Sequence, residues 1–126
     1  MTDLNANQRT VLAFYEQAVK RRDFPAAARF LAPVLIQHRT DAADGAEGLR
    51  EFIDRMRAAY PHGSYEIKRV FADGDYVILH VHVVREPGAR GSAHVDIFRL
   101  DNGKVAEHWD VDEPIPAEIA NPNGPF

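Results

Sequence analysis

Two histidines on one predicted strand and an aspartate on the next are the residues best placed to do chemistry. His80 and His82 alternate along the first strand, and Asp96 lies on the second. A symmetric connection over residues 86–91 would put His82 opposite Asp96 and His80 opposite Phe98. Apolar surroundings raise a carboxyl pKa and an adjacent imidazolium lowers it, so such a pair can act as general acid and base. The alternative interpretation is an ordinary buried His–Asp hydrogen bond.

The strand that carries Asp96 continues into a predicted β-hairpin with Asn102-Gly103 at its turn. Asn-Gly tolerates the positive φ angles of a type I′ turn. Pairing outward from this turn puts Trp109 opposite Asp96. One face of the sheet would then mix aromatic, aliphatic and ionisable side chains, which is typical of a ligand pocket. The residues predicted for this face are Tyr76, Ile78, His80, His82, Val84, His94, Asp96, Phe98, Trp109 and Val111.

The opposite face of the same sheet is predicted to be mostly aliphatic. Such a face is too apolar for open solvent, and a second copy of the chain is the simplest cover. We therefore expect a homodimer through this outer face. Its predicted members are Val77, Leu79, Val81, Val83, Val95 and Ile97, with His108 and Asp110 alongside.

Two histidines and one carboxylate are also a metal-ligand set. His80, His82 and Asp96 could hold iron or zinc, which makes a metal-dependent enzyme one alternative. Alternating histidines also arise on any strand that faces a pocket, so we predict no metal and no cofactor. The sequence has no cysteine, and it shows no glycine-rich phosphate loop, nucleophile elbow or dinucleotide fingerprint.

The composition indicates one ordinary globular domain over residues 1–126. Apolar residues make up 45% of the chain and charged residues 27%. The formal net charge is −4, and the only basic run, residues 20–22, is predicted to complement a helix dipole. This pattern argues against nucleic-acid binding. No apolar run approaches the roughly 20 residues of a membrane span, and we expect a cytoplasmic protein.

The order of the predicted elements, helices first and then a run of strands, indicates an α+β fold with helices on one face of a bent sheet. The tail over residues 114–126 contains four prolines and is predicted to be irregular, a candidate cover for the pocket. The predicted helices are 5–22, 24–32 and 46–60, and the predicted strands are 34–39, 65–72, 76–85, 92–100 and 104–112.

Four stretches of the sequence resemble a known family. They read FYEQAVKRRDFPAAARFLAP, LIQHR with DGAEGLREFI, VDIFRLDNGKVAEHWDV, and NPNGPF. The chain resembles the SnoaL-like branch of the nuclear transport factor 2-like superfamily, which includes polyketide cyclases, ketosteroid isomerases and predicted aldol-condensation enzymes. The resemblance implies a cone-shaped, curved mixed or antiparallel sheet, wrapped by three helices from the N-terminal half around a deep pocket.

The resemblance also implies roles for individual residues. Asp96 stands where SnoaL-type cyclases keep an acid/base carboxylate, and His82 where they keep a neighbouring histidine. In ketosteroid isomerases the position of Asp96 holds an oxyanion-binding acid, and Tyr15 matches their oxyanion tyrosine. His38 stands where those isomerases have their catalytic aspartate. This difference argues against steroid isomerase activity, although a histidine can itself act as a base.

Together these observations predict a cofactor-free acid/base enzyme that acts on a hydrophobic carbonyl compound, by an aldol condensation, cyclisation or isomerisation. Asp96, His82 and His38 are its predicted catalytic residues. The alternative is a module of the same fold that binds a small hydrophobic molecule without chemistry. The residues predicted to contact the ligand are Tyr15, Gln37, His80, Phe98 and Trp109.

Overall fold

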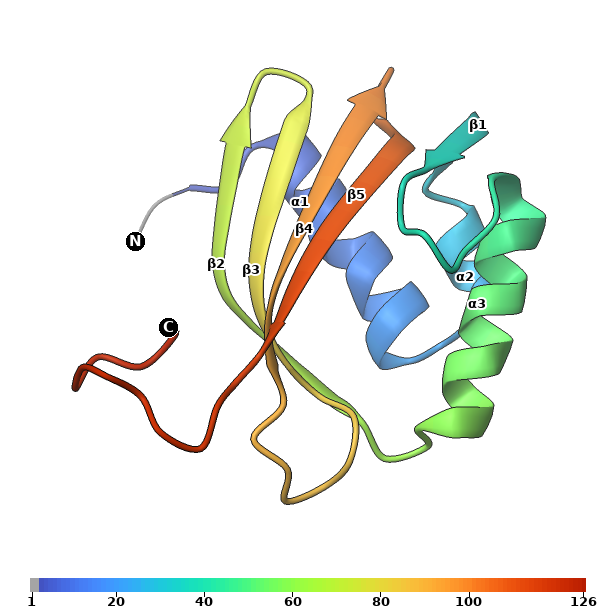
Figure 1. Cartoon of the computed structure of the whole chain (residues 1–126). Coiled ribbons are helices and arrows are strands. Elements are labelled where there is room, and N and C mark those ends of the chain that lie inside the picture. Colours follow the sequence, from blue (N-terminus) through green and yellow to red (C-terminus); the bar gives the residue numbers. More distant parts are fainter. Residues whose placement is uncertain (1–2) are drawn as a thin grey trace.

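The computed structural model describes residues 3–126 and shows three helices packed on one face of a five-stranded sheet (Figure 1). The strand order is β1-β5-β4-β3-β2; β1 runs parallel to β5 and the other pairs are antiparallel. The predicted α+β fold with a mixed sheet is therefore confirmed. The helices are α1 (Ala6–Tyr15), which continues into the π-helical turn η1 (Glu16–Lys20), α2 (Phe24–Ala28) and α3 (Gly45–Ala59). The strands are β1 (Leu31–Gln37), β2 (Ser64–Asp73), β3 (Tyr76–Val84), β4 (Ser92–Asp101) and β5 (Lys104–Pro114).

Local sequence signals explain where the N-terminal helices begin. Asn5 and Gln8 form a reciprocal capping box at the start of α1. The Asp23 side chain accepts a hydrogen bond from the Ala26 N–H, and a proline occupies the first turn of α2. Helix α2 ends at Ala28, earlier than predicted, because β1 begins at Leu31.

The hairpin between β4 and β5 has the predicted turn but not the predicted register. Asn102 and Gly103 have φ angles of 50° and 75°, as a type I′ turn requires. Farther from the turn, Leu100 pairs with Val105 but Arg99 pairs with Glu107. The residue between those two partners, Ala106, is therefore the extra residue of a β-bulge.

This bulge moves every later residue of β5 by one position. Trp109 pairs with Ile97, and Asp110 pairs with Asp96. The prediction that Trp109 lies opposite Asp96 is therefore wrong. A shift by one residue turns each side chain to the other face of the sheet, so His108 and Asp110 point where Trp109 was expected.

The predicted pairing of β3 with β4 is also wrong. His82 lies opposite Ala93 rather than Asp96, and Asp96 lies opposite Leu79. Val83 pairs with Ser92, and the residue before Ser92, Gly91, approaches β3 closely: a Cβ there would lie 2.1 Å from the carbonyl oxygen of Val83. The observed partner of His82, Ala93, is three residues from the predicted partner, Asp96. Because three is an odd number, this difference in register exchanges the two faces of β3.

The aliphatic side of β3 consequently forms the core and is not an outer surface. Its side chains are at most 4% exposed and pack with α1 and α3. The β3 part of the face predicted to form the dimer contact is thus covered by the helices of the same chain, whereas Val95 and Ile97 lie on the outer face. The core residues of β3 are Val77, Leu79, Val81 and Val83.

The C-terminal tail packs on the outer face of the sheet, not over the pocket as expected. The Phe126 ring lies 4.8 Å from the His82 ring and 5.3 Å from the His80 ring, centroid to centroid. Arg69 donates a hydrogen bond to the Phe126 carbonyl. No helix within residues 3–126 is both long and apolar enough to cross a membrane.

Candidate functional site

A cavity of about 90 Å³ lies between the helices and the inner face of the sheet. One part of its wall is apolar and includes Phe14, Leu35, Leu49, Phe52, Ile53, Met56 and Phe98. The remaining part carries ionisable and polar side chains from β1, β4 and β5 and from the segment after β1. These are Gln37, Arg39, His94, Asp96, His108 and Asp110.

Asp96 is the most deeply buried of these ionisable groups, with 4% of its surface exposed. Its Oδ1 atom lies 2.8 Å from His108 Nε2, and its Oδ2 atom is buried without a hydrogen-bond partner in the described part of the chain. Burial alone would raise the pKa of Asp96, but hydrogen bonds from His108 and His94 outweigh it and lower the pKa below its usual value. Asp96 is therefore a carboxylate at neutral pH, held by one oxygen.

The hydrogen bonds of His108 fix its proton positions. Gln37 Oε1 accepts the backbone N–H of Arg39 at 2.9 Å, so that atom is the amide oxygen and not the nitrogen. The same oxygen lies 2.8 Å from His108 Nδ1, which must therefore carry a proton. The Nε2 atom in turn donates a hydrogen bond to the Asp96 carboxylate.

His94 is surrounded by carboxylates. Its Nε2 atom lies 3.4 Å from Asp96 Oδ1 and 3.4 Å from Asp110 Oδ2, and its Nδ1 atom lies 2.9 Å from Asp112 Oδ1. Burial lowers the pKa of His94, but Asp110, Asp96 and Asp112 together raise it to about 10. His94 is therefore an imidazolium at neutral pH.

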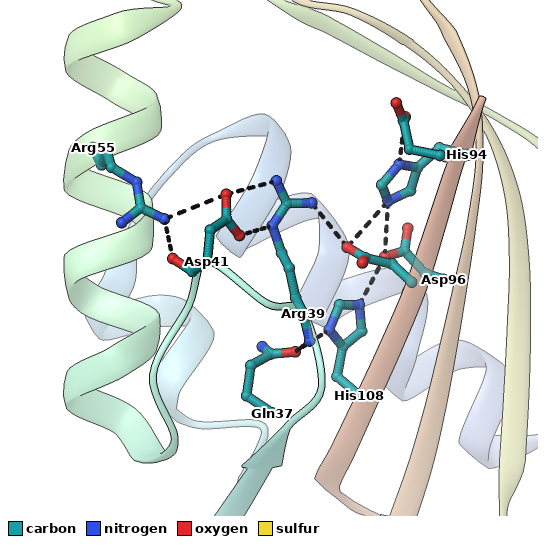
Figure 2. A network of polar contacts seen from close by, with 9 residues as sticks. Gln37, Arg39, Asp41, Arg55, His94, Asp96 and His108 are labelled. Atoms are coloured by element: carbon teal, nitrogen blue, oxygen red, sulfur yellow. Dashed lines mark hydrogen bonds and ion pairs between the residues drawn. The ribbon is translucent and has the colours of Figure 1, made fainter. Parts of the chain in front are cut away.

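Arg39 links this cluster to helix α3 (Figure 2). Its Nη1 atom donates to Asp110 Oδ2 at 2.9 Å, and its Nε atom donates to Asp41 Oδ1 at 2.6 Å. Arg55 on α3 donates to the Asp41 carbonyl at 2.6 Å, and the Arg39 guanidinium lies 4.9 Å from the centre of the Phe52 ring. Burial raises the pKa of Asp110, but His94 and Arg39 lower it to about 2.

Tyr15 brings a neutral hydroxyl into the same cavity from α1. Burial, and then the charge of Asp96, raises its pKa far above the usual value of 10. Its hydroxyl makes no hydrogen bond within residues 3–126, so this O–H is available to a ligand.

The same cluster has the spacing of a metal site. One possible ligand atom from each of three residues, His94, Asp96 and Asp110, lies within 4.8 Å of the other two. The donor set suits a divalent cation in principle. However, protonated His94 and the Arg39 guanidinium already neutralise both carboxylates. A metal at this position would therefore have to replace the proton on His94.

Four of the eight predicted site residues line the cavity, and four do not. Asp96, Tyr15, Gln37 and Phe98 line it. The other four lie on the outer side of the sheet, so the predicted metal trio His80, His82 and Asp96 is not assembled. His82 Nε2 lies 2.8 Å from the Arg90 carbonyl, His80 Nδ1 lies 2.9 Å from Arg69 Nη1, and His38 Nε2 lies 2.7 Å from Glu107 Oε2 and stacks on Trp109 at 4.7 Å.

The sequence reasoning missed His94, His108, Asp110 and Arg39 as partners of Asp96. For His108 and Asp110 the available signal was the apolar pair Val105-Ala106, which interrupts strict alternation and marks a bulge. Both residues of that pair are buried, at 0% and 4% exposure. His94 was predicted on the same face as Asp96, and the structure confirms that placement.

The fold and the buried polar cluster define a small pocket protein of mixed α and β structure. The family model of the SnoaL-like domain matches residues 11–108, and the chain belongs to that family. No match was found among curated protein sequences.

Solved structures with similar folds share little sequence with this chain. A proposed polyketide cyclase from Acidithiobacillus ferrooxidans superposes with a TM-score of 0.74 at 18% identity, covering 89% of this chain and 91% of that one. TsrD from Streptomyces laurentii gives 0.71 at 20% identity over 89% and 91%. An NTF2-like protein of unknown function from Cytophaga hutchinsonii gives 0.69 at 18% identity over 90% and 96%. At such identities the similarity shows the fold alone.

Proposed function

We propose that this chain is an acid/base enzyme that needs no cofactor and acts on a hydrophobic carbonyl compound, as an aldol-type cyclase or an isomerase. One observation carries the proposal: Asp96 is ionised, is fixed through Oδ1, and has a second buried oxygen with no partner in residues 3–126. A buried carboxylate oxygen without a partner is costly unless it has a task. Abstraction of a proton from a substrate is such a task.

The proposed step is removal of a proton from the carbon next to the substrate carbonyl. The C–H proton passes to Asp96 Oδ2, and the electron pair of that bond moves into the carbonyl to form an enolate. The enolate then attacks a second carbonyl group, whose oxygen takes the proton from Asp96, or the enolate of an unsaturated substrate takes the proton back at another carbon. The first path gives an aldol-type cyclisation and the second an isomerisation.

The surrounding groups suit the charge that develops. The Tyr15 hydroxyl stays neutral and can donate a hydrogen bond to the enolate oxygen. As Asp96 takes a proton, its hydrogen bond from His108 Nε2 weakens, and Gln37 keeps the other His108 proton on Nδ1. Phe98 and the apolar wall exclude water from this step.

The test is exchange of α-protons with deuterium in heavy water, followed by NMR for a panel of small hydrophobic ketones and aldehydes. Wild-type protein should accelerate exchange for at least one compound. Asp96→Asn should lower that rate by roughly 100-fold or more, whereas Asp101→Asn, an exposed change on the same strand, should leave it unchanged. Binding of the compounds without any exchange would favour the non-catalytic module instead.

We also propose that a second copy of the chain covers the outer face of the sheet. Phe71 on β2 and Val111 on β5 are 55% and 66% exposed there. Arg69 lies on the β2 side of this face and Glu113 on the β5 side. A two-fold axis along the strands would bring each basic side over the acidic side of the other copy, which supports self-association.

A further inference from the structure

Two arginines line the cavity without an acidic partner. Arg22 follows η1, and Arg85 follows β3. Within residues 3–126, no carboxylate oxygen lies within 4.0 Å of either guanidinium. Arg39, in the same wall, differs because it pairs with both Asp41 and Asp110.

Arg22 is held inside the protein by an unusual backbone. Its φ angle is 56°, which non-glycine residues rarely adopt, and only 8% of its surface is exposed. The prediction that residues 20–22 complement a helix dipole did not include this burial. Its guanidinium donates to the Tyr60 carbonyl at 2.5 Å and to the Tyr65 hydroxyl at 2.9 Å, and both acceptors are neutral.

One nitrogen atom of the Arg85 side chain has no hydrogen-bond partner. Its Nε is buried and makes no hydrogen bond within the described chain. Its guanidinium lies 5.6 Å from the centre of the Tyr60 ring, so the same tyrosine contributes its ring to Arg85 and its carbonyl to Arg22. The two cations therefore belong to one corner of the cavity.

Arg22 is buried and Arg85 is half-buried. Removing a cation from water without an opposite charge is costly, and two cations in one corner also repel each other. A ligand anion would relieve both effects. Guanidinium groups bind carboxylates particularly well, because two parallel N–H groups match the two oxygens. We propose that this corner, Arg22 with Arg85, binds a carboxylate group of the ligand.

The position of this corner indicates which end of the ligand it holds. Arg85 lies beyond the last residue of β3, whereas Asp96 pairs with Leu79 near the middle of that strand. The carboxylate therefore lies away from the carbon that Asp96 deprotonates. This statement rests on the proposed function for the reacting end. The ligand class is then a carbonyl acid with an apolar body between its two polar ends.

The cavity also limits the size of that body. Its volume of about 90 Å³ is below the range of roughly 300–1,000 Å³ that is usual for drug-sized ligands. A compact body, such as a single ring, is expected.

The test measures binding and needs no turnover. Benzoate, phenylacetate and 3-benzoylpropionate are each compared with their primary amides, which have nearly the same shape but no charge, by calorimetry and ligand-observed NMR. Wild-type protein should bind at least one acid tenfold or more tightly than its amide. Arg85→Gln and, separately, Arg22→Gln should reduce this preference to within about twofold. Arg21→Gln removes an equal charge from an exposed neighbour and should preserve it.

Equal binding of every acid and its amide by wild-type protein would overturn the inference, as would a preference that survives in Arg85→Gln. Acetate binding as tightly as benzoate would also overturn it, because the corner would then be a site for free anions. Arg85→Gln keeps the inference testable if Arg22→Gln fails to fold. Asp96→Asn should retain the acid preference, so a protein without proton exchange but with that preference would refute the proposed function alone.

Discussion

The side-chain oxygen of Gln37 determines which nitrogen of His108 carries a fixed proton. It accepts both the Arg39 backbone N–H and the His108 Nδ1–H, at 2.9 and 2.8 Å. The opposite nitrogen of the ring, Nε2, is thereby aimed at the Asp96 carboxylate and donates a hydrogen bond to it. Gln37 touches neither Asp96 nor the expected position of the reacting carbon, so it is a positioning residue.

Replacing Gln37 by leucine should slow proton transfer without weakening ligand binding much. The His108 Nδ1–H would lose its acceptor, so the ring would no longer be held with Nε2 facing Asp96. We expect kcat to fall by about 10- to 100-fold, with KM changed by less than about threefold. Gln37→Glu keeps an oxygen at this position and should be much less affected.

The readout specific to this role is the pair of ¹⁵N shifts of the His108 ring. In wild-type protein they should report protons on both nitrogens, and in Gln37→Leu the Nδ1 shift should move toward that of an unprotonated nitrogen. Unchanged shifts together with unchanged kcat would rule out the positioning role.

The charge on His94 should make stability depend on pH in the alkaline range. The pKa of His94 is raised from 6.5 to about 10 in the folded protein. Its contribution to the free energy of unfolding is therefore complete below pH 6.5 and disappears as the pH rises through about 10. We expect a loss on the order of 3 kcal/mol over this window.

Urea unfolding at several pH values measures this effect. His94→Gln should unfold with little pH dependence between 6.5 and 10, although it should be less stable at pH 6. On the acid side, the pKa of Asp110 is lowered from 3.8 to about 2, so its contribution is present above pH 3.8 and is lost as the pH falls through 2. An alkaline slope that is the same in both proteins would contradict this account of His94.

Gly91 should be far less tolerant of substitution than Gly88 in the same loop. Both have positive φ angles, 75° and 85°. An added Cβ meets nothing within 4 Å at Gly88, but at Gly91 it lies 2.1 Å from the Val83 carbonyl oxygen. Gly88→Ala should cost about 1 kcal/mol from backbone strain, and Gly91→Ala about 3 kcal/mol or more. Chemical denaturation of the two variants compares these costs, and equal values would show that the close approach is unimportant.

If the outer face forms a dimer, a substitution that introduces a charge there should lower the mass of the particle in solution. Val111→Glu places a carboxylate among the exposed apolar side chains of β5, and it should shift the protein toward the monomer. Ala58→Glu adds the same charge on the exposed side of α3 and should not. Light scattering after size-exclusion chromatography measures the mass, and a wild-type protein that is already monomeric would refute the dimer.

The sequence was sufficient for features that depend on neighbouring residues. The turn at Asn102-Gly103, the cap at Asp23 and the order of helices and strands follow from local backbone preferences. The pocket position of Asp96 also agrees with the prediction, and its catalytic role stays a prediction.

The sequence could not show which side chains of each strand face the cavity, because this depends on contacts between distant segments. Gly91 lets its segment approach β3 closely, and Ala106 adds one residue to β5. Both registers differ from the predicted ones by an odd number of residues, which exchanges the faces. Only the bulge leaves a local signal, the apolar pair Val105-Ala106 that interrupts the alternation. As a result the sequence paired Asp96 with His82, whereas the folded chain pairs it with His94 and His108.

The extra residue in β5 also makes the cavity tolerant of one change in chain length. Loss of the single codon for Ala106 would leave the Asn102-Gly103 turn intact, and Arg99 would still pair with Glu107 and Asp96 with Asp110. Such a deletion would remove the bulge but keep His108 and Asp110 on the inner face. Related chains that lack this one residue should therefore keep the same ionisable groups in the cavity.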